Sequence, residues 1–310
     1  MTDTSTAAKA LKSGKLVAFP TETVYGLGAD AQNEMAVARI YEAKGRPADH
    51  PLIVHIASKA QLANWASKVP IYATALADAY WPGPMTLILE RSELAKDFVT
   101  GNQDSVGLRV PNHPVALELL NEFMQLGGKG VAAPSANRFG KVSPTTSQAV
   151  QDELGTYLEP GDVILEGGNS AVGIESTIID CRAAAPKVLR PGAITIEMIE
   201  QATGLSLDES DSNLRVSGAL ENHYAPNAKV VLDEPPSEGD GFIAMSNVET
   251  PQGAIRLASP ATLDEYAKVL YQSLRAADQQ SIERVVVWQP TGNGIAVAIR
   301  DRLRRASNQS

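Results

Sequence analysis

Apolar and polar residues follow two different periods along the first two thirds of the chain. Short apolar runs, which are typical of buried strands, predict β-strands at Lys15–Pro20, Leu52–Ile56, Met85–Leu89, Val106–Val110, Val131–Ala133, Val163–Leu165, Ile174–Asp180 and Lys187–Leu189. Apolar residues spaced by three or four positions predict helices at Ser58–Ala66, Ile71–Tyr80, Pro114–Phe123, Thr146–Leu154 and Ile196–Ala202. This alternation predicts an α/β domain with a twisted mixed sheet and flanking helices.

Local signals define one further helix and one loop near the start of the chain. Asn33 is a good N-cap for a helix that directs Val37 and Ile40 inward, and Gly45 marks its end. Lys44 therefore lies at a helix C-terminus. The segment Thr21–Gly28, which follows the first strand, contains two glycines and is expected to form a shaped loop rather than continue the strand.

The periodic pattern stops at Gly204 and resumes at Lys229. The segment 204–228 is rich in Ser, Asp, Glu, Asn and Gly and is interpreted as a linker. Strands are then predicted at Lys229–Leu232, Gly241–Ala244, Gly253–Leu257 and Ile282–Trp288, with helices after Thr262 and at Gly294–Ala306. The chain is thus predicted to hold a catalytic domain at 1–203, the linker at 204–228 and a small Rossmann-like α/β domain at 229–310.

Composition narrows the class of protein. The 310 residues are 44% hydrophobic and carry a net charge of -9, with 17 basic against 22 acidic residues up to position 203 and 10 against 14 afterwards. Neither part has the basic excess typical of nucleic-acid binding. No signal-peptide core or membrane-length apolar run occurs, and the single cysteine, Cys181, is expected to be buried. We expect a cytoplasmic globular protein.

Common nucleotide and metal motifs are absent or weak. Gly26–Ala31 and Gly292–Gly294 partly resemble a dinucleotide-binding turn, which keeps a nucleotide-dependent oxidoreductase open as an alternative. There is no Walker-type phosphate loop. The four histidines show no spacing typical of metal ligands, so no metal site is predicted.

Small polar and cationic residues do gather at strand ends and in loops, where α/β folds present ligands. They are Thr21, Thr23, Tyr25, Lys44, Arg46, Arg109, Ser135, Asn137, Ser143, Ser176, Thr177 and Arg190. Singly, each has an ordinary explanation: a turn hydroxyl, a loop cap, or a cation at a helix C-terminus. An arginine in an apolar strand, such as Arg109, nevertheless needs an anionic partner from the protein or from a substrate.

Six short motifs occur along the chain in an order and at spacings that resemble one known protein family. PTETVYGLGAD, KGRP with HPLIVHI, LRVP, PSAN, ESTIID and LRPGAI resemble the YrdC-like domain of threonylcarbamoyl-AMP synthases over about residues 11–202. HYAP at His223–Pro226, together with segments at Tyr271–Asp278 and Ala298–Ala306, resembles the C-terminal domain of the longer family members.

The resemblance implies a reaction. The family joins L-threonine, bicarbonate and ATP into threonylcarbamoyl-AMP and releases pyrophosphate, and the product serves a transfer machinery that modifies a tRNA adenosine next to the anticodon. Mg²⁺ is expected to travel with ATP, held by phosphates rather than by a dedicated protein site. Direct tRNA binding is expected to be weak or absent, and a noncatalytic RNA-binding module of the same fold remains the second alternative.

The resemblance also implies roles for single residues. The catalytic residues would be Lys44 and Arg46. The threonine contacts would be Thr23, His55, Arg109, Ala133 and Ser176. The ATP contacts would be Arg46, His50, Ser105, Ser135, Asn137, Ser143, Arg190 and Tyr224, although the family commonly has asparagine where this chain has His50. The linker would fold over the adenylate as a lid and so limit its hydrolysis.

Overall fold

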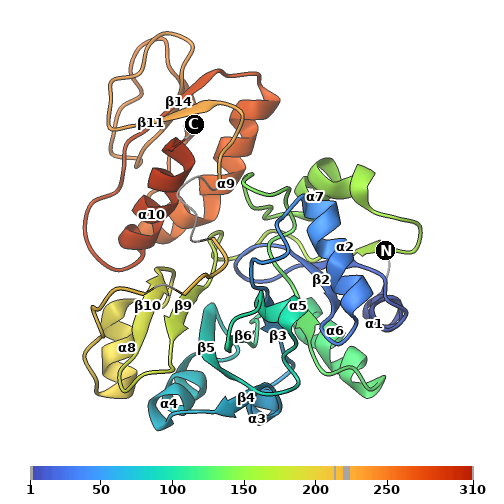
Figure 1. Ribbon diagram of the computed structural model, residues 1–310. Coiled ribbons are helices and arrows are strands. Elements are labelled where there is room, and N and C mark those ends of the chain that lie inside the picture. The colour runs from blue at the N-terminus through green and yellow to red at the C-terminus, as the bar shows by residue number, and fades with distance from the viewer. Residues whose placement is uncertain (1–2, 213, 219–223, 309–310) are drawn as a thin grey trace.

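The computed structural model describes residues 3–212, 214–218 and 224–308. Its strands form two sheets, one of ten strands and one of four, which follow one another along the chain (Figure 1). The ten-stranded sheet ends at Arg190 and the four-stranded sheet begins at Lys229. The boundaries predicted at 203 and 228 fall between the two sheets and stay a prediction.

The larger sheet is mixed and is covered by helices. Its strands are β1 (Val17–Phe19), β2 (Gly26–Asp30), β3 (Ile53–His55), β4 (Ala66–Lys68), β5 (Met85–Arg91), β6 (Ser105–Arg109), β7 (Val131–Ala132), β8 (Val163–Ile164), β9 (Thr177–Asp180) and β10 (Lys187–Arg190). They lie in the order β10-β9-β5-β6-β3-β7-β2-β1-β8, with β4 paired to β5. The helical elements are α1 (Thr4–Lys12), α2 (Glu34–Lys44), η1 (Lys59–Gln61), α3 (Leu62–Trp65), α4 (Ile71–Tyr80), α5 (Asp97–Thr100), α6 (Pro114–Gln125), α7 (Ser147–Leu154), η2 (Gly155–Tyr157) and α8 (Ile196–Thr203). The predicted mixed α/β architecture is confirmed.

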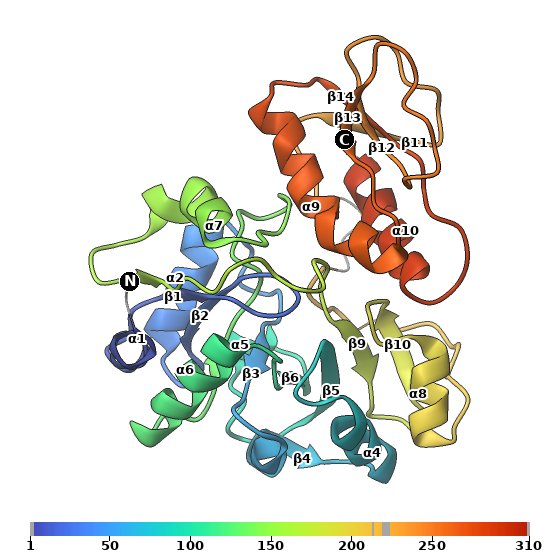
Figure 2. The ribbon, with the colours of Figure 1, turned by 180° about the vertical axis from the view of Figure 1, so that it is seen from behind.

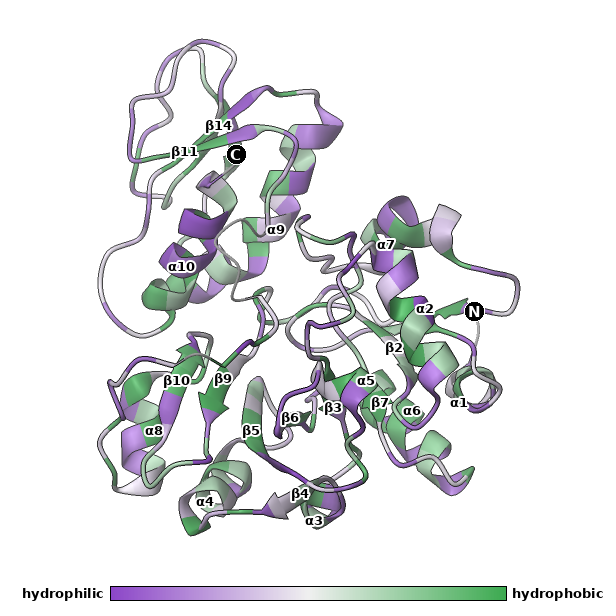
Figure 3. Cartoon of the chain, in the orientation of Figure 1, coloured by the Kyte–Doolittle hydropathy of each residue, from purple (hydrophilic) through white to green (hydrophobic). Residues whose placement is uncertain are grey.

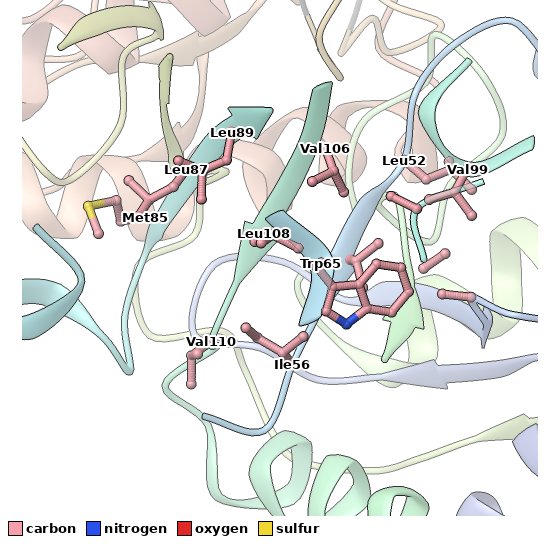
Figure 4. Packing of buried hydrophobic residues seen from close by; sticks show 14 of the residues in the cluster. Leu52, Ile56, Trp65, Met85, Leu87, Leu89, Val99, Val106, Leu108 and Val110 are labelled. Atoms are coloured by element: carbon pink, nitrogen blue, oxygen red, sulfur yellow. The ribbon is translucent and has the colours of Figure 1, made fainter. Parts of the chain in front are cut away.

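The main core of this domain lies between the sheet and its helices. Trp65, Leu87 and Leu108 are fully buried there and pack together with other side chains of β5, β6 and β3 (Figure 4). Burial of each such side chain stabilises the fold by about 1.5–3 kcal/mol. Strands β5 and β9 are hydrophobic along most of their length, whereas α8 and α10 (Ile295–Ser307) carry both kinds of residue (Figure 3). The sheet is thereby fixed as a rigid base for the loops at its strand ends.

One expectation about the start of the chain is wrong. Gly26–Gly28, which we expected in a loop, belong to strand β2 (Gly26–Asp30), which is paired antiparallel with β1 and with β7. A Cβ on Gly28 would lie 2.6 Å from Val131 Cγ1, so the glycine allows close packing within the sheet instead of interrupting it. Only Thr21–Tyr25 remain as the loop, and they precede the strand.

Two further segments differ from the sequence-based expectation. Helix α1 was not predicted, yet it buries Ala7, Ala8 and Leu11 on one face. The helix predicted at 58–66 consists of η1 and α3, and the chain then turns into β4. Helix α1 had local signals that sequence reasoning missed, since Asp3 caps it and its apolar residues share one face. The short η1 and α3, by contrast, gain their structure from packing.

The smaller sheet is entirely parallel. Its strands β11 (Lys229–Leu232), β12 (Gly241–Ile243), β13 (Ile255–Ala258) and β14 (Arg284–Val287) lie in the order β11-β14-β12-β13. Helices α9 (Leu263–Gln279) and α10 lie between this sheet and the larger domain (Figure 2). Thr262 caps α9 as predicted, since its side chain accepts from the backbone of Glu265 at 3.1 Å.

The two domains make close contact through α9 and α10. A Cβ on Gly173 of the larger domain would lie 2.4 Å from the Cα of Lys268 in α9. Arg275 of α9 pairs with Glu153 of α7 at 3.1 Å. The C-terminal domain is thus positioned directly against the loops that follow β7 and precede β9.

Candidate functional site

A polar pocket lies where loops of the larger domain meet Ser217, Gly218 and Tyr224 of the linker. Its described lining consists of Thr21, Thr23, Val24, Gly26, Arg46, Ile53, His55, Arg109, Ala133, Pro134, Ser135, Glu175, Ser176, Arg190, Ser217, Gly218 and Tyr224. These residues come from segments spread over two hundred positions. Nine of the predicted site residues therefore share one cavity: Thr23, Arg46, His55, Arg109, Ala133, Ser135, Ser176, Arg190 and Tyr224.

Strand pairing positions one end of this pocket. β3 and β6 are parallel neighbours whose register places His55 opposite Arg109 at the ends of both strands. Thr23 is fully buried, and its hydroxyl lies 2.9 Å from the Thr21 hydroxyl. Burial and the adjacent Arg109 charge lower the pKa of His55 to about 3, so its imidazole is neutral at physiological pH.

Arg109 has a partner that sequence reasoning missed. Its Nη2 atom lies 2.9 Å from Oε2 of Glu22, and both side chains are buried. Glu22 was visible in the PTET motif, but nothing in the sequence showed that its side chain turns toward a strand 87 positions away. The pair satisfies the requirement that a buried arginine be neutralised.

Lys44 and Arg46 lie at the C-terminal end of α2, as predicted. Gly45 has a left-handed φ of 61°, which turns the chain between them. Arg46 lines the pocket and donates to the carbonyl of Pro51 at 3.0 Å, and burial lowers its pKa to about 10. Lys44 is buried behind the lining, where its Nζ donates to the carbonyls of Ser135 (2.6 Å) and Asn137.

The PSAN segment forms the adjoining wall. Ser135 lines the pocket, whereas Asn137 is fully buried and donates to the carbonyls of Arg138 (2.7 Å) and Lys141 (2.8 Å). Asn137 therefore shapes the loop rather than lining the cavity. Ser143 also lies behind the lining, where its hydroxyl donates to Oε1 of Glu175 at 2.6 Å.

Arg190 and the linker form another part of the lining. Arg190 donates to the Ser176 hydroxyl at 3.1 Å and to the Ser217 carbonyl at 2.8 Å. Tyr224 is buried and stacks on Tyr271 of α9, with ring centroids 5.5 Å apart. Glu175, Ser217 and Gly218 are lining residues that sequence reasoning missed, and His223 of the HYAP motif lies outside the described residues.

Two predicted nucleotide contacts lie elsewhere. Ser105 begins β6 and lines a separate, mainly apolar groove with Ile88 and Leu214. His50 is half-buried, and its ring packs edge-on against Phe139 at 5.4 Å between centroids. Neither side chain is among the described residues that line the polar pocket.

Within the described part of the chain, no three His, Cys, Asp or Glu side chains are grouped so that they could hold a metal ion. The described helices also include none that is both long enough and apolar enough to cross a membrane. Cys181 is buried, as expected.

Comparison with known proteins covers almost the whole chain. Residues 9–192 match the Sua5, YciO and YrdC family model, described as telomere recombination, and residues 194–308 match the model of the threonylcarbamoyl-AMP synthase C-terminal domain. A threonylcarbamoyl-AMP synthase of Pyrococcus abyssi is 39% identical over 97% of this chain and 93% of its own length. One from Bacillus subtilis is 37% identical over 97% and 92%. The crystal structure of P. abyssi Sua5 complexed with L-threonine superposes with a TM-score of 0.87 at 37% identity, covering 98% of this chain and 94% of that one.

Proposed function

The chain belongs to the threonylcarbamoyl-AMP synthase family, and on that premise we propose that this enzyme joins L-threonine, bicarbonate and ATP into threonylcarbamoyl-AMP and releases pyrophosphate. One observation carries the proposal. Arg46, Arg109 and Arg190, from segments far apart in the sequence, line a single pocket together with the hydroxyls of Thr23, Ser135 and Ser176. Such a pocket suits two anionic substrates bound side by side.

The two substrates would occupy different ends of the pocket. Threonine would occupy the end formed by Thr23, His55, Arg109, Ala133 and Ser176, with its carboxylate on the planar guanidinium of Arg109. ATP would occupy the end formed by Arg46, Ser135, Arg190 and Tyr224. At the threonine end, the neutral imidazole of His55 adds a polar contact without adding a second positive charge beside Arg109.

The reaction needs positioning more than proton transfer. The threonine nitrogen bonds to the carbon of bicarbonate, water leaves, and the resulting carbamate oxygen attacks the α-phosphorus of ATP as the bond to pyrophosphate breaks. Fixed cations such as Arg46 and Arg190 stabilise the charge that builds on the phosphoryl oxygens. Lys44 would act from behind Ser135, by holding the two carbonyls that it binds.

Further partners follow from the chemistry of the product. We expect a tRNA-threonylcarbamoyl transferase machinery in the cytoplasm to consume the adenylate, with little direct tRNA binding by this chain. Mg²⁺ would arrive with ATP and be held by the phosphates. Glu175, the only carboxylate among the described lining residues, already accepts three hydrogen bonds and does not suit a metal ligand.

The proposal is tested by incubating the purified chain with ATP, L-threonine and bicarbonate. Pyrophosphate release should require all three compounds, and threonylcarbamoyl-AMP should accumulate as detected by mass spectrometry. Lys44→Ala and Arg46→Ala should each nearly abolish product, whereas Arg284→Gln, remote in the C-terminal domain, should not. Pyrophosphate release that does not depend on threonine would contradict the assignment.

A further inference from the structure

A buried polar cluster centred on Glu175 joins the two domains beside the pocket. Oε1 of Glu175 accepts from Ser143 of its own domain at 2.6 Å. Oε2 accepts from the Tyr271 hydroxyl of α9 and from Nε of Arg302 in α10, each at 2.8 Å. Two side chains of the C-terminal domain thus complete the hydrogen bonding of a carboxylate that lines the substrate pocket.

The charge of Glu175 is balanced from the C-terminal domain. Burial alone raises the pKa of Glu175, but the charges of Arg302 and then Arg190, with the hydrogen bonds of Ser143 and Arg302, outweigh it and lower that pKa to about 2. Glu175 is therefore ionised in the folded protein. An ionised carboxylate without Arg302 would repel any phosphate group that entered the same pocket.

Arg302 also contacts two other segments that reach the pocket. Its Nη2 donates to the carbonyl of Pro191, the neighbour of Arg190, at 3.0 Å. Its guanidinium carbon lies 5.4 Å from the ring centroid of Tyr224. Because Arg302 is fully buried and is not among the described lining residues, it acts on the pocket through these groups.

Resting on the function proposed above, we propose that Arg302 is a positioning residue for ATP. By neutralising Glu175 and holding Pro191 and Tyr224, it keeps the lining residues Arg190 and Tyr224 in the arrangement that accepts the triphosphate. The C-terminal domain thereby takes part in nucleotide binding. The threonine end of the pocket, formed by Thr23, His55 and Arg109, receives no contact from Arg302 among the hydrogen bonds of the described residues.

The test measures binding of a nonhydrolysable ATP analogue and of L-threonine separately, together with both KM values, in the full chain. Arg302→Gln should weaken analogue binding and raise KM for ATP by roughly tenfold or more, since it leaves a buried carboxylate unpaired. Threonine affinity should change less than about twofold. Glu175→Gln in the Arg302→Gln background removes the uncompensated charge and should restore most of the ATP affinity.

Matched variants separate positioning from loss of folding. Arg284→Gln makes the same substitution at an ion-paired arginine of the C-terminal domain, whose partners are Glu234 and Asp240, and should leave both affinities unchanged. If Arg302→Gln fails to fold, Tyr271→Phe removes only one hydrogen bond to Glu175 and should raise KM for ATP by a few-fold.

Each outcome decides between the hypotheses. If the unaltered chain makes no threonylcarbamoyl-AMP, the proposed function fails and the inference fails with it. If the unaltered chain makes the product but Arg302→Gln binds the analogue as tightly, only the inference is overturned. If Arg302→Gln lowers the affinities for ATP and for threonine equally, and Glu175→Gln does not restore them, the inference is also overturned, because such a result indicates a purely structural role.

Discussion

The Nζ atom of Lys44 lies 2.6 Å from the carbonyl oxygen of Ser135, although 91 positions separate the two residues. This contact joins the end of α2 to the PSAN wall of the pocket. The two motifs therefore form one structural unit in which the Lys44 side chain of the first supports the backbone of the second. Substitutions at Lys44 should consequently affect stability and activity in different ways.

Lys44→Met should remove a pH dependence of stability. Burial, followed by the Arg46 charge, holds the pKa of Lys44 well below its usual value. Below the usual lysine pKa of about 10.4, the unfolded chain binds a proton that the folded chain binds less readily, so unfolding becomes easier as pH falls. Between pH 7 and 10 the free energy of unfolding of the unaltered protein should rise relative to Lys44→Met, by up to about 1.4 kcal/mol per pH unit.

Urea unfolding at pH 7, 8.5 and 10 measures this difference, with exposed Lys59→Met as the control. If the difference in the free energy of unfolding between the unaltered protein and Lys44→Met stays constant across this range, Lys44 is fully protonated in the folded state. Product formation by Lys44→Met should be nearly abolished at every pH.

His55→Gln should make the protein more resistant to acid. The pKa of His55 is lowered to about 3 in the folded state, against about 6.5 when unfolded. The unfolded chain therefore takes up a proton first, and the unaltered protein loses up to about 1.4 kcal/mol per pH unit as pH falls from 6.5 toward 3. Thermal unfolding at pH 7, 6, 5 and 4 measures this difference. The unfolding midpoint temperature should fall less steeply with decreasing pH for His55→Gln than for the unaltered protein. His50→Gln, at a half-buried ring, should have a smaller effect; identical profiles for all three proteins would contradict the prediction.

Arg109→Gln should act mainly on threonine. Loss of a charge-assisted contact to the carboxylate should raise KM for threonine by roughly 10- to 100-fold. KM for ATP should change little, because Arg109 lies with Thr23 and His55 in the part of the pocket that we assign to threonine. Steady-state kinetics with each substrate varied in turn provides the measurement. The double variant Glu22→Gln/Arg109→Gln removes the orphaned carboxylate and should fold at least as well as the single variant; equal effects on both KM values would reject the assignment of Arg109 to threonine.

Gly173→Ala should weaken the contact between the domains. The new Cβ would lie 2.4 Å from the Cα of Lys268, and the φ of +84° is already unfavourable for alanine. Gly168→Ala is the matched control, because φ is +75° there but nothing lies within 4 Å of the added atom. In urea unfolding, Gly168→Ala should lower the free energy of unfolding by about 1 kcal/mol and Gly173→Ala by about 3 kcal/mol or more. Equal costs at the two positions would show that α9 moves away freely.

The elements with strong local signals could be predicted from the sequence. Asn33 and Thr262 cap their helices through their own side chains, and the strands from β5 to β7 follow apolar runs that are buried on both faces. Nine of the site residues predicted from the sequence motifs line one cavity. These features depend on residues close in the sequence, or on motifs that occur along this chain in the same order as in the family.

The remaining features depend on contacts between distant segments. Gly26–Asp30 becomes a strand because two neighbouring strands offer hydrogen bonds, and Gly28 is required by the close approach of Phe19 and Val131 rather than by a turn. The family resemblance predicts Ser105 as an ATP contact, yet its strand directs it to another groove. The Glu22 and Glu175 pairings join residues 87 and 127 positions apart, and no local pattern indicates them.

The carboxylate of Glu175 has a consequence for dissecting the protein. A fragment that stops at the end of the linker would lack Tyr271 and Arg302. The Glu175 carboxylate, which these two residues cover in the intact chain, would then be exposed to solvent without these partners. A separately produced fragment 229–310 would in turn expose an arginine that is fully covered in the intact chain. The two pieces are therefore expected to be poor enzymes alone and to regain activity on mixing, since each carries the counter-charge that the other lacks.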